Sequence, residues 1–276
     1  MRRLLGAVVV VAALGACGGV TAGSPDRASS TGGPPVGYIS FTECSGGMCS
    51  EQPQFGLDAA FASAGFAPQT AVALATSDAC AAYGASSAGS ASTSSPIVSA
   101  GTLTLSGGPM GAGVTVTPGD GPANPDFYAY NDDSTLFFSA GQTLTVSGSG
   151  ATVPAFGPES IVAPALPVLV APVAVSGFYR IPTSADLVVE WTGGLAGGTF
   201  TFSAVGADGS QYLSCEWPAS LGRGTIPRAI LAPFAGTSND GASIQYQQQV
   251  ATTFAAGEYT ISVTAQQYGT GQLMFE

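Results

Sequence analysis

The sequence of 276 residues contains no lysine and no histidine, and only 8% of its residues are charged. Without histidine, the chain cannot build a Ser-His-Asp triad, a Cys-His pair or a histidine-ligated zinc site. Without lysine, it has neither a Schiff-base residue nor the lysine of a phosphate-binding loop. Its net charge of −11 excludes the basic stripe that binds nucleic acid. We therefore expect no nucleic-acid partner and no cofactor.

The N-terminus has the pattern of an export signal. Arg2 and Arg3 precede an uncharged run of thirteen residues, 4–16, which is too short to span a bilayer but fits the apolar core of a signal peptide. The run ends in Leu14-Gly15-Ala16-Cys17, which resembles the lipobox of bacterial lipoproteins. The resemblance implies that residues 1–16 are removed and that Cys17 is lipidated. The alternative is an ordinary secretory signal that happens to end at a cysteine.

The residues after Cys17 predict a tether. Residues 17–35 are dominated by Gly, Ser, Thr, Ala and Pro, a composition that buries little apolar surface and is typical of flexible linkers. By the sorting rule of lipoproteins in two-membrane bacteria, Gly18 in place of Asp implies the outer membrane. We therefore expect an exported protein that is attached to the outer membrane through its lipid.

The remaining cysteines predict disulfides. An even number of cysteines in an exported chain favours pairing, and sequence alone leaves three connectivities open for Cys44, Cys49, Cys80 and Cys215. The glycine-containing loop from Cys44 to Cys49 makes a local bridge easy, which would leave Cys80 to pair with Cys215. A four-thiolate metal site is disfavoured because the spacing lacks paired C-x₂-C units.

The body of the chain reads as short antiparallel strands. Apolar residues recur at every second position and are separated by Thr, Ser, Gln and Glu, as in half-buried strands. Residues 187–191, 200–204, 213–217 and 259–265 are examples, and Asp208-Gly209 favours a hairpin between the second and third. The only helical candidate is a single turn, Arg228 to Leu231, after Pro227. We predict an all-β fold, an antiparallel immunoglobulin-like β-sandwich.

The length after the tether favours two lobes, since one sandwich takes about 100 residues. We expect the first lobe over residues 36–159 and the second over 160–276, with a single larger sandwich as the alternative. Residues 161–175 are apolar but contain Pro164, Pro167 and Pro172, which favours an edge strand or a connector over a second membrane span. Residues 84–96 have the low complexity of a surface loop.

Four segments carry a further resemblance. VSAGTLTLSGG (98–108), GQTLTVSGSGATVPAF (141–156), PTSADLVVEWTGG (182–194) and CEWPASLGRGTIPRAILAPF (215–234) are similar to segments of uncharacterised secreted lipoproteins of high-GC diderm bacteria. The resemblance implies an all-β lipoprotein and carries no catalytic residue.

Carboxylates are the one class of catalytic group that the sequence offers in number. Glu190 and Glu216 each precede a tryptophan, Trp191 and Trp217, and two carboxylates beside aromatic rings are what a glycosidase requires. Two solvated strand glutamates next to core tryptophans explain the pattern equally simply. We expect no enzyme activity and keep a carboxylate-dependent hydrolase, such as a glycosidase, as the alternative.

A cluster of Asp and Asn offers weak candidates for a calcium site: Asp120, Asp126, Asn131, Asp132 and Asp133. The default interpretation is that these residues form turns. Phe127, Tyr128 and Tyr130 beside them could form a platform for a sugar or pack in the core. The sequence thus predicts a lipid-anchored envelope protein with a structural or binding role, toward a glycan or another envelope protein.

Overall fold

A computed structural model describes residues 33–44, 54–63, 72–84, 97–110, 113–119, 126–132, 138–207, 209, 211–237 and 241–276. Over these residues the protein is mostly β, as predicted, with several antiparallel sheets and one short helix, α1 (Arg228–Leu231), at the predicted position. Within the described ranges, no helix has the length and apolar character needed to cross a bilayer.

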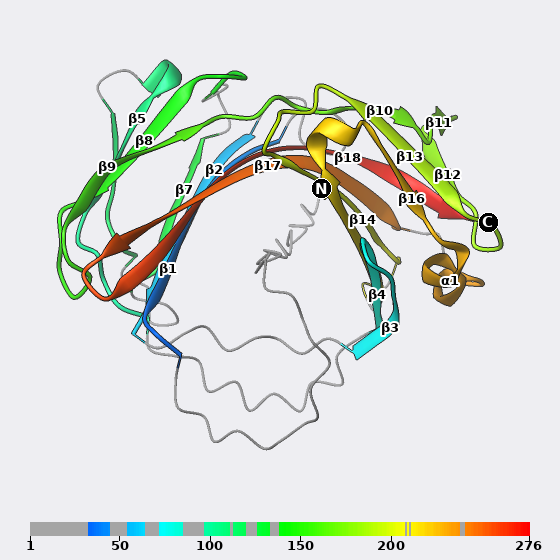
Figure 1. Ribbon diagram of the computed structural model, residues 1–276, viewed down its shortest axis with the longest axis horizontal. Helices are drawn as coiled ribbons and strands as arrows, with labels where there is room; N and C mark the ends of the chain where they lie inside the picture. The colour runs from blue at the N-terminus through cyan, green and yellow to red at the C-terminus, as the bar shows by residue number, and fades with distance from the viewer. Residues whose placement is uncertain are drawn as a thin grey trace, which may run out of the picture. The chain divides into compact units, whose positions relative to one another are not determined.

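Eleven strands form one large sheet (Figure 1). Nine of them follow one another in the spatial order β3 (Val72–Thr76), β4 (Cys80–Gly84), β15 (Tyr212–Pro218), β14 (Thr199–Val205), β17 (Ser243–Ala256), β18 (Tyr259–Phe275), β1 (Val36–Cys44), β2 (Gln54–Ala62) and β7 (Tyr128–Asp132). The other two are β12 (Phe178–Ile181), which pairs with β18, and β11 (Ala174–Val175), which pairs with β12. Neighbouring strands are antiparallel except that β1 and β12 each run parallel to β18.

Two smaller sheets complete the fold. One has four strands in the order β6 (Val114–Val116), β5 (Leu103–Gly107), β8 (Thr143–Gly148) and β9 (Phe156–Val162). The other has three, in the order β10 (Val168–Ala171), β13 (Leu187–Thr192) and β16 (Arg223–Ile226). Short 3₁₀ turns lie at Gly108–Met110, Ala219–Leu221 and Ala232–Phe234.

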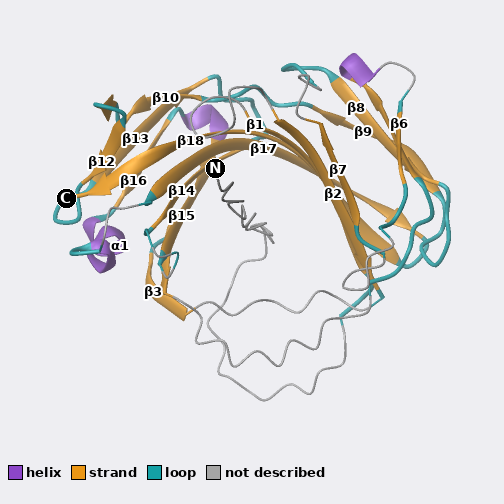
Figure 2. Cartoon of the chain, turned by 180° about the vertical axis from the view of Figure 1, so that it is seen from behind, coloured by secondary structure: helices purple, strands orange, loops and turns teal. Residues whose placement is uncertain are grey.

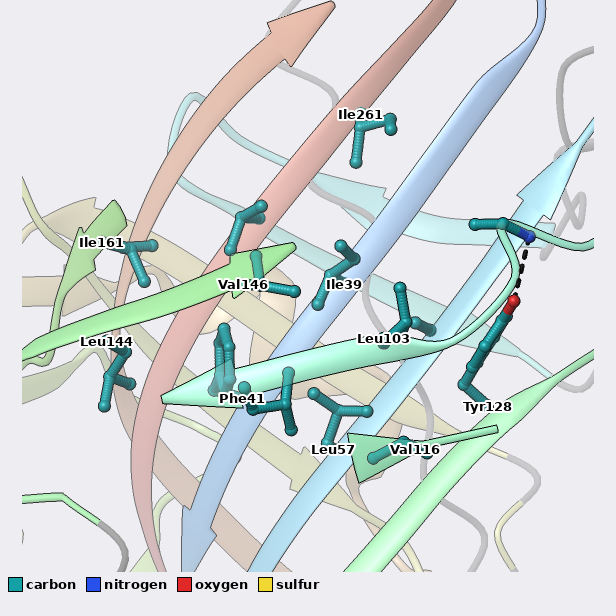
Figure 3. Packing of buried hydrophobic residues seen from close by; sticks show 14 of the residues in the cluster. Ile39, Phe41, Leu57, Leu103, Val116, Tyr128, Leu144, Val146, Ile161 and Ile261 are labelled. Carbon is teal, nitrogen blue, oxygen red and sulfur yellow. Dashed lines mark hydrogen bonds between the residues drawn. The ribbon is translucent and has the colours of Figure 1, made fainter. Parts of the chain in front are cut away.

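The first hydrophobic core joins the four-stranded sheet to the large sheet (Figure 3). Leu103, Leu144 and Val146 of the small sheet are fully or almost fully buried against Ile39 and Phe41 of β1. These residues alternate with polar ones along each strand, which is why the predicted period of two places them on one face.

The second core joins the three-stranded sheet to the other end of the large sheet. Its centre is aromatic: the Trp191 ring stacks on Phe200 with ring centroids 3.9 Å apart and planes at 5°, and it lies 5.7 Å from Trp217. Leu187, Val189 and Trp191 face the same core as Leu213, Cys215 and Trp217, which confirms the register predicted for these strands.

The long strands β17 and β18 serve both cores (Figure 2). On β18, Ile261 and Val263 lie in the first core, whereas Leu273 and Phe275 lie in the second, and all four are odd-numbered residues on the same face of the strand. Both small sheets therefore pack on one side of the large sheet. The boundary expected near residue 160 lies within β9, and each core takes strands from both sides of it.

A row of buried polar side chains separates the two cores. Glu43 of β1, Gln267 of β18 and Gln248 of β17 occupy matching positions on three adjacent strands and are all at most 7% exposed. The Glu43 carboxylate accepts a hydrogen bond from the Phe138 N–H at 3.2 Å, and Gln248 Oε1 accepts one from the Leu195 N–H at 3.2 Å. Such a row fixes the alignment of the three strands, because a shift by one residue would move each polar group to the other face.

Candidate polar binding face

The side of the large sheet opposite the two cores is the candidate site, and we call it the polar face. Because side chains alternate along a strand, the even-numbered residues of β18 point to this side while the odd-numbered residues are buried. The sheet register then assigns the facing residues of every neighbouring strand.

Hydroxyl and amide groups dominate the polar face. Its central strands present these side chains: Tyr38, Ser40 and Thr42 of β1; Thr199, Thr201 and Ser203 of β14; Ser214 of β15; Gln245, Gln247 and Gln249 of β17; and Thr264, Gln266, Tyr268 and Thr270 of β18. Each of these groups can donate and accept hydrogen bonds. All of them are half-buried except Thr201, which is buried.

Neighbouring side chains on this face partly satisfy one another. Thr264 Oγ1 donates to Ser40 Oγ at 3.1 Å across β18 and β1, and Gln245 Nε2 donates to Gln247 Oε1 at 2.9 Å along β17. Gln247 lies between Thr201 of β14 and Tyr268 of β18 in the register. The result is a preformed grid of polar groups at the spacing of strands, about 4.8 Å.

Two carboxylates interrupt this neutral grid: Glu216 of β15, opposite Thr201, and Asp58 of β2. Asp58 lies opposite Ser40, and burial raises the pKa of its carboxyl. Burial, reinforced by the negative charge of Asp58, raises the pKa of Tyr38 to about 12. The same two causes, burial first, raise the pKa of Tyr268. Both phenols therefore stay protonated near neutral pH.

A pair of stacked rings lies at the β4–β15 end of the polar face. Tyr83 and Tyr212 are opposite each other in the register, with ring centroids 4.6 Å apart and planes at 20°. Both rings are half-buried. Burial is the larger cause that raises the pKa of Tyr212, and the neighbouring Tyr83 is the smaller one. Within the described part of the polar face, this half-buried aromatic pair is the one that suits the apolar face of a sugar ring.

Positive charge is nearly absent from this surface. In the part of the chain that the structure describes, arginines are limited to Arg180, Arg223 and Arg228, and none lies on the central strands of the polar face. Arg180, on β12 at the far end of the sheet, forms an ion pair with Glu276. The face can therefore hold a neutral polar ligand and offers no cation to a phosphate or sulfate group.

The two glutamates considered for a glycosidase are not brought together. Their neighbours Trp191 and Trp217 pack in the second core, so Glu190 of β13 and Glu216 of β15 point away from that core on opposite outer sides. The aromatic layer lies between them. Glu190 and Glu216 therefore do not face each other, as the acid and the nucleophile of a glycosidase must.

One predicted disulfide is confirmed. Cys80 and Cys215 lie opposite each other on β4 and β15 and are bonded, which links residues 135 positions apart. Cys44 also takes part in a disulfide. Cys17, Cys49 and Gly18 lie outside the described residues, so the Cys44–Cys49 bridge and the lipidation of Cys17 stay predictions.

Tyr128 is a core residue and not a sugar platform (Figure 3). It is fully buried, its hydroxyl donates to the Gly101 carbonyl at 2.6 Å, and it accepts a hydrogen bond from the Ala100 N–H at 2.9 Å. Tyr130 packs against the same core. Phe127 lies beside them and is half-buried.

The calcium candidates stay a prediction. Asp120 and Asp133 lie outside the described residues, as do the side chains of Asn131 and Asp132, which leaves only Asp126. Among the side chains that the structure does describe, no group of three or more Cys, Asp and Glu residues is arranged to hold a metal ion.

The polar face itself was not anticipated from the sequence. Its signal is visible in the Gln245-Tyr246-Gln247-Gln248-Gln249 segment and in the Thr and Ser residues that alternate with the core residues of β18. Alternation alone predicts that such residues face away from a core. It does not predict that six strands align them into one continuous surface.

Neither protein-family models nor curated proteins give a match to this sequence.

Proposed function

We propose that this protein is a non-catalytic, lipid-anchored component of the bacterial cell envelope that binds a neutral glycan on its polar face. The observation that carries the proposal is the composition of that face: hydroxyl and amide side chains on six adjacent strands, a stacked tyrosine pair, and no arginine on the central strands. Sugar hydroxyls require both donors and acceptors, and these groups supply both.

The proposal includes the arrangement and location expected from the sequence. Each core lies between the large sheet and one small sheet, which supports a β-sandwich of immunoglobulin-like type with two lobes. The Cys80–Cys215 disulfide is consistent with export, since such bonds persist in oxidising compartments. The lipobox at Cys17 and the following Gly18 support attachment to the outer membrane.

Binding is tested with residues 32–276, which form one compact unit containing both cores. Affinity electrophoresis against neutral polysaccharides (xylan, glucan, mannan) and anionic ones (alginate, heparin) should show retardation by at least one neutral polymer and by neither anionic one. Tyr212→Ala should weaken binding about tenfold, the loss of one good aromatic contact. Thr225→Ala, an exposed change on β16 outside the polar face, is the matched control. Retardation by the anionic polymers alone, or none at all, would overturn the proposal.

Anchoring is tested separately. The wild-type chain expressed in a diderm host should incorporate radiolabelled palmitate and partition into detergent, because several acyl chains together give stable membrane attachment. Cys17→Ser should abolish both. Labelling of the Cys17→Ser chain would show that the lipobox interpretation is wrong.

A further inference from the structure

One surface outside the polar face is unusually apolar, and we call it the valine surface. It consists of Val168 and Val170 of β10, Val173 after that strand, Val175 of β11 and Val188 of β13. All five are exposed, between 39% for Val188 and 69% for Val173. Val188 comes two residues before Glu190, and Glu190 pairs with Ala171 at the end of β10. Val188 therefore lies beside the chain that continues from β10 toward β11.

The segment that carries four of these five valines has no charge. Residues 160–179 contain no Asp, Glu, Arg or Lys, although the chain as a whole has a net charge of −11. Soluble proteins seldom expose a contiguous apolar patch without a partner for it. Glu190 of β13 and Arg223 of β16 lie next to Val188 on the same outer face, so the uncharged part of the valine surface is the stretch from Val168 to Phe178. An uncharged apolar stretch on an acidic protein suits a partner that is itself apolar.

The patch ends in a projecting hairpin. β11 and β12 pair at Val175 and Phe178, and the two residues between them, Ser176 and Gly177, both have positive φ values, 54° and 85°. This is the geometry of a tight two-residue hairpin turn. The turn places the exposed Val175 beside the half-buried Phe178.

The edges of this surface are poorly suited to pairing with a strand of a second protein. β11 has two residues, and β10 has four, with a register shift between Leu169 and Ala171. Pro167 and Pro172 flank β10 and lack the N–H that strand addition needs. The apolar side chains, not the backbone edges, are what this surface offers to a partner.

We infer that the valine surface, led by the β11–β12 hairpin, contacts the lipid bilayer to which the N-terminus is attached. The choice of occupant rests on the proposed lipid anchor. Eighteen residues separate Cys17 from Val36, and a chain of that length can reach at most about 60 Å when fully extended. Val36 pairs with Thr260 and Phe178 pairs with Gln272, twelve residues further along β18, which is about 40 Å at the rise of a strand and within that reach. The tether would hold the folded unit beside the bilayer, where shallow insertion of Val173, Val175 and Phe178 buries apolar area without any requirement for anionic lipid.

The test holds the protein at a membrane without using Cys17. A hexahistidine tag replaces residues 1–17, and the chain is bound to phosphatidylcholine vesicles that contain a nickel-chelating lipid. The sequence has no histidine, so the tag is the sole point of attachment. Phe178→Trp places a reporter in the hairpin, and Thr115→Trp places a control at an exposed site on β6. Brominated acyl chains should quench the tryptophan at position 178 and leave the one at 115 unaffected.

A second measurement needs no new tryptophan. Flotation of untagged residues 32–276 with the same phosphatidylcholine should show partitioning that is independent of salt. Val173→Ser and Val175→Ser should each lower the partition coefficient about tenfold, the effect of two methyl groups. Val205→Ser, an exposed valine on β14, should have no effect.

Equal quenching at positions 178 and 115 would overturn the inference. A soluble dimer that dissociates on the same valine substitutions would also overturn it. Failure of palmitate labelling at Cys17 would instead contradict the proposed lipid anchor and would leave the quenching and flotation results as the test of the valine surface.

Discussion

At the scale of single residues, the clearest contrast is between Trp191 and Glu190. Trp191 is 2% exposed, its ring stacks on Phe200, and its Nε1 donates to the Ala219 carbonyl at 2.7 Å. Glu190 is adjacent in sequence but points to the outer side of β13, opposite Arg223 of β16. Strand alternation thus gives two neighbours very different roles.

This contrast predicts very different mutational costs. Trp191→Ala should lower the free energy of unfolding by about 3–5 kcal/mol through lost burial and the cavity left behind. Glu190→Gln should change it by less than about 1 kcal/mol, as is typical at a surface site. Urea denaturation of both variants measures the difference. Equal midpoints would contradict the register described for β13.

A second prediction concerns Asp58 and pH. Because burial raises its pKa in the folded state, the stabilising effect of its neutral form is fully present below the usual value of 3.8 and is lost as pH rises through the folded pKa. Asp58→Asn stays neutral at all pH values. It should therefore be more stable than wild type at pH 7 and should lose this advantage at acid pH. Thermal melting curves of Asp58→Asn and wild type, measured from acid to neutral pH, test this prediction. A difference in melting temperature that does not vary with pH would rule the explanation out.

At the scale of elements, the short hairpin of β3 and β4 depends on its attachment to β15. Four residues of β4 pair with β15, and the Cys80–Cys215 bond adds a covalent link that closes a loop of 135 residues. Long loops give the largest entropic benefit from a disulfide in the chain-entropy account.

Removal of this bond should therefore be costly. The double variant Cys80→Ala, Cys215→Ala should lose about 2–5 kcal/mol of stability. Thr104→Ala, an exposed substitution on β5 of the four-stranded sheet, is the control. Chemical denaturation without reductant provides the measurement. Unchanged stability of the double variant would show that β15 holds β4 by packing alone.

Most individual strands could be predicted from the sequence, but apart from the β14–β15 hairpin their pairing could not. The period of two in residues 187–191, 213–217 and 259–265 identified both the strands and their buried faces. Pairing depends on contacts between distant segments, such as the parallel alignment of β1 with β18, and nothing local in either strand encodes it. The single helical turn at Arg228–Leu231 could be predicted because Pro227 begins it.

At the scale of the whole molecule, two cores share one sheet because β17 and β18 are long. These strands have 14 and 17 residues, so one hairpin reaches both cores. Gly269 and Gly271 of β18 leave room for the rings of Tyr246 and Tyr179, since an added Cβ would lie 2.5 Å and 2.4 Å from them. The candidate site could not be foreseen, because it exists only once these strands bring six polar stripes side by side.

At the scale of the whole molecule, the polar face is expected to bind an uncharged glycan. The most direct measurement is calorimetric titration of residues 32–276 with xylohexaose and with mannohexaose, at low and high salt, for wild type and for Gln247→Ala. Gln247 lies mid-face between Thr201 and Tyr268. We predict that wild type binds at least one of the two sugars and that salt does not change the affinity, because no ion pair forms. Gln247→Ala should bind about tenfold more weakly, which corresponds to the loss of about one well-placed hydrogen bond. Binding that salt abolishes, or that Gln247→Ala leaves unchanged, would contradict the account.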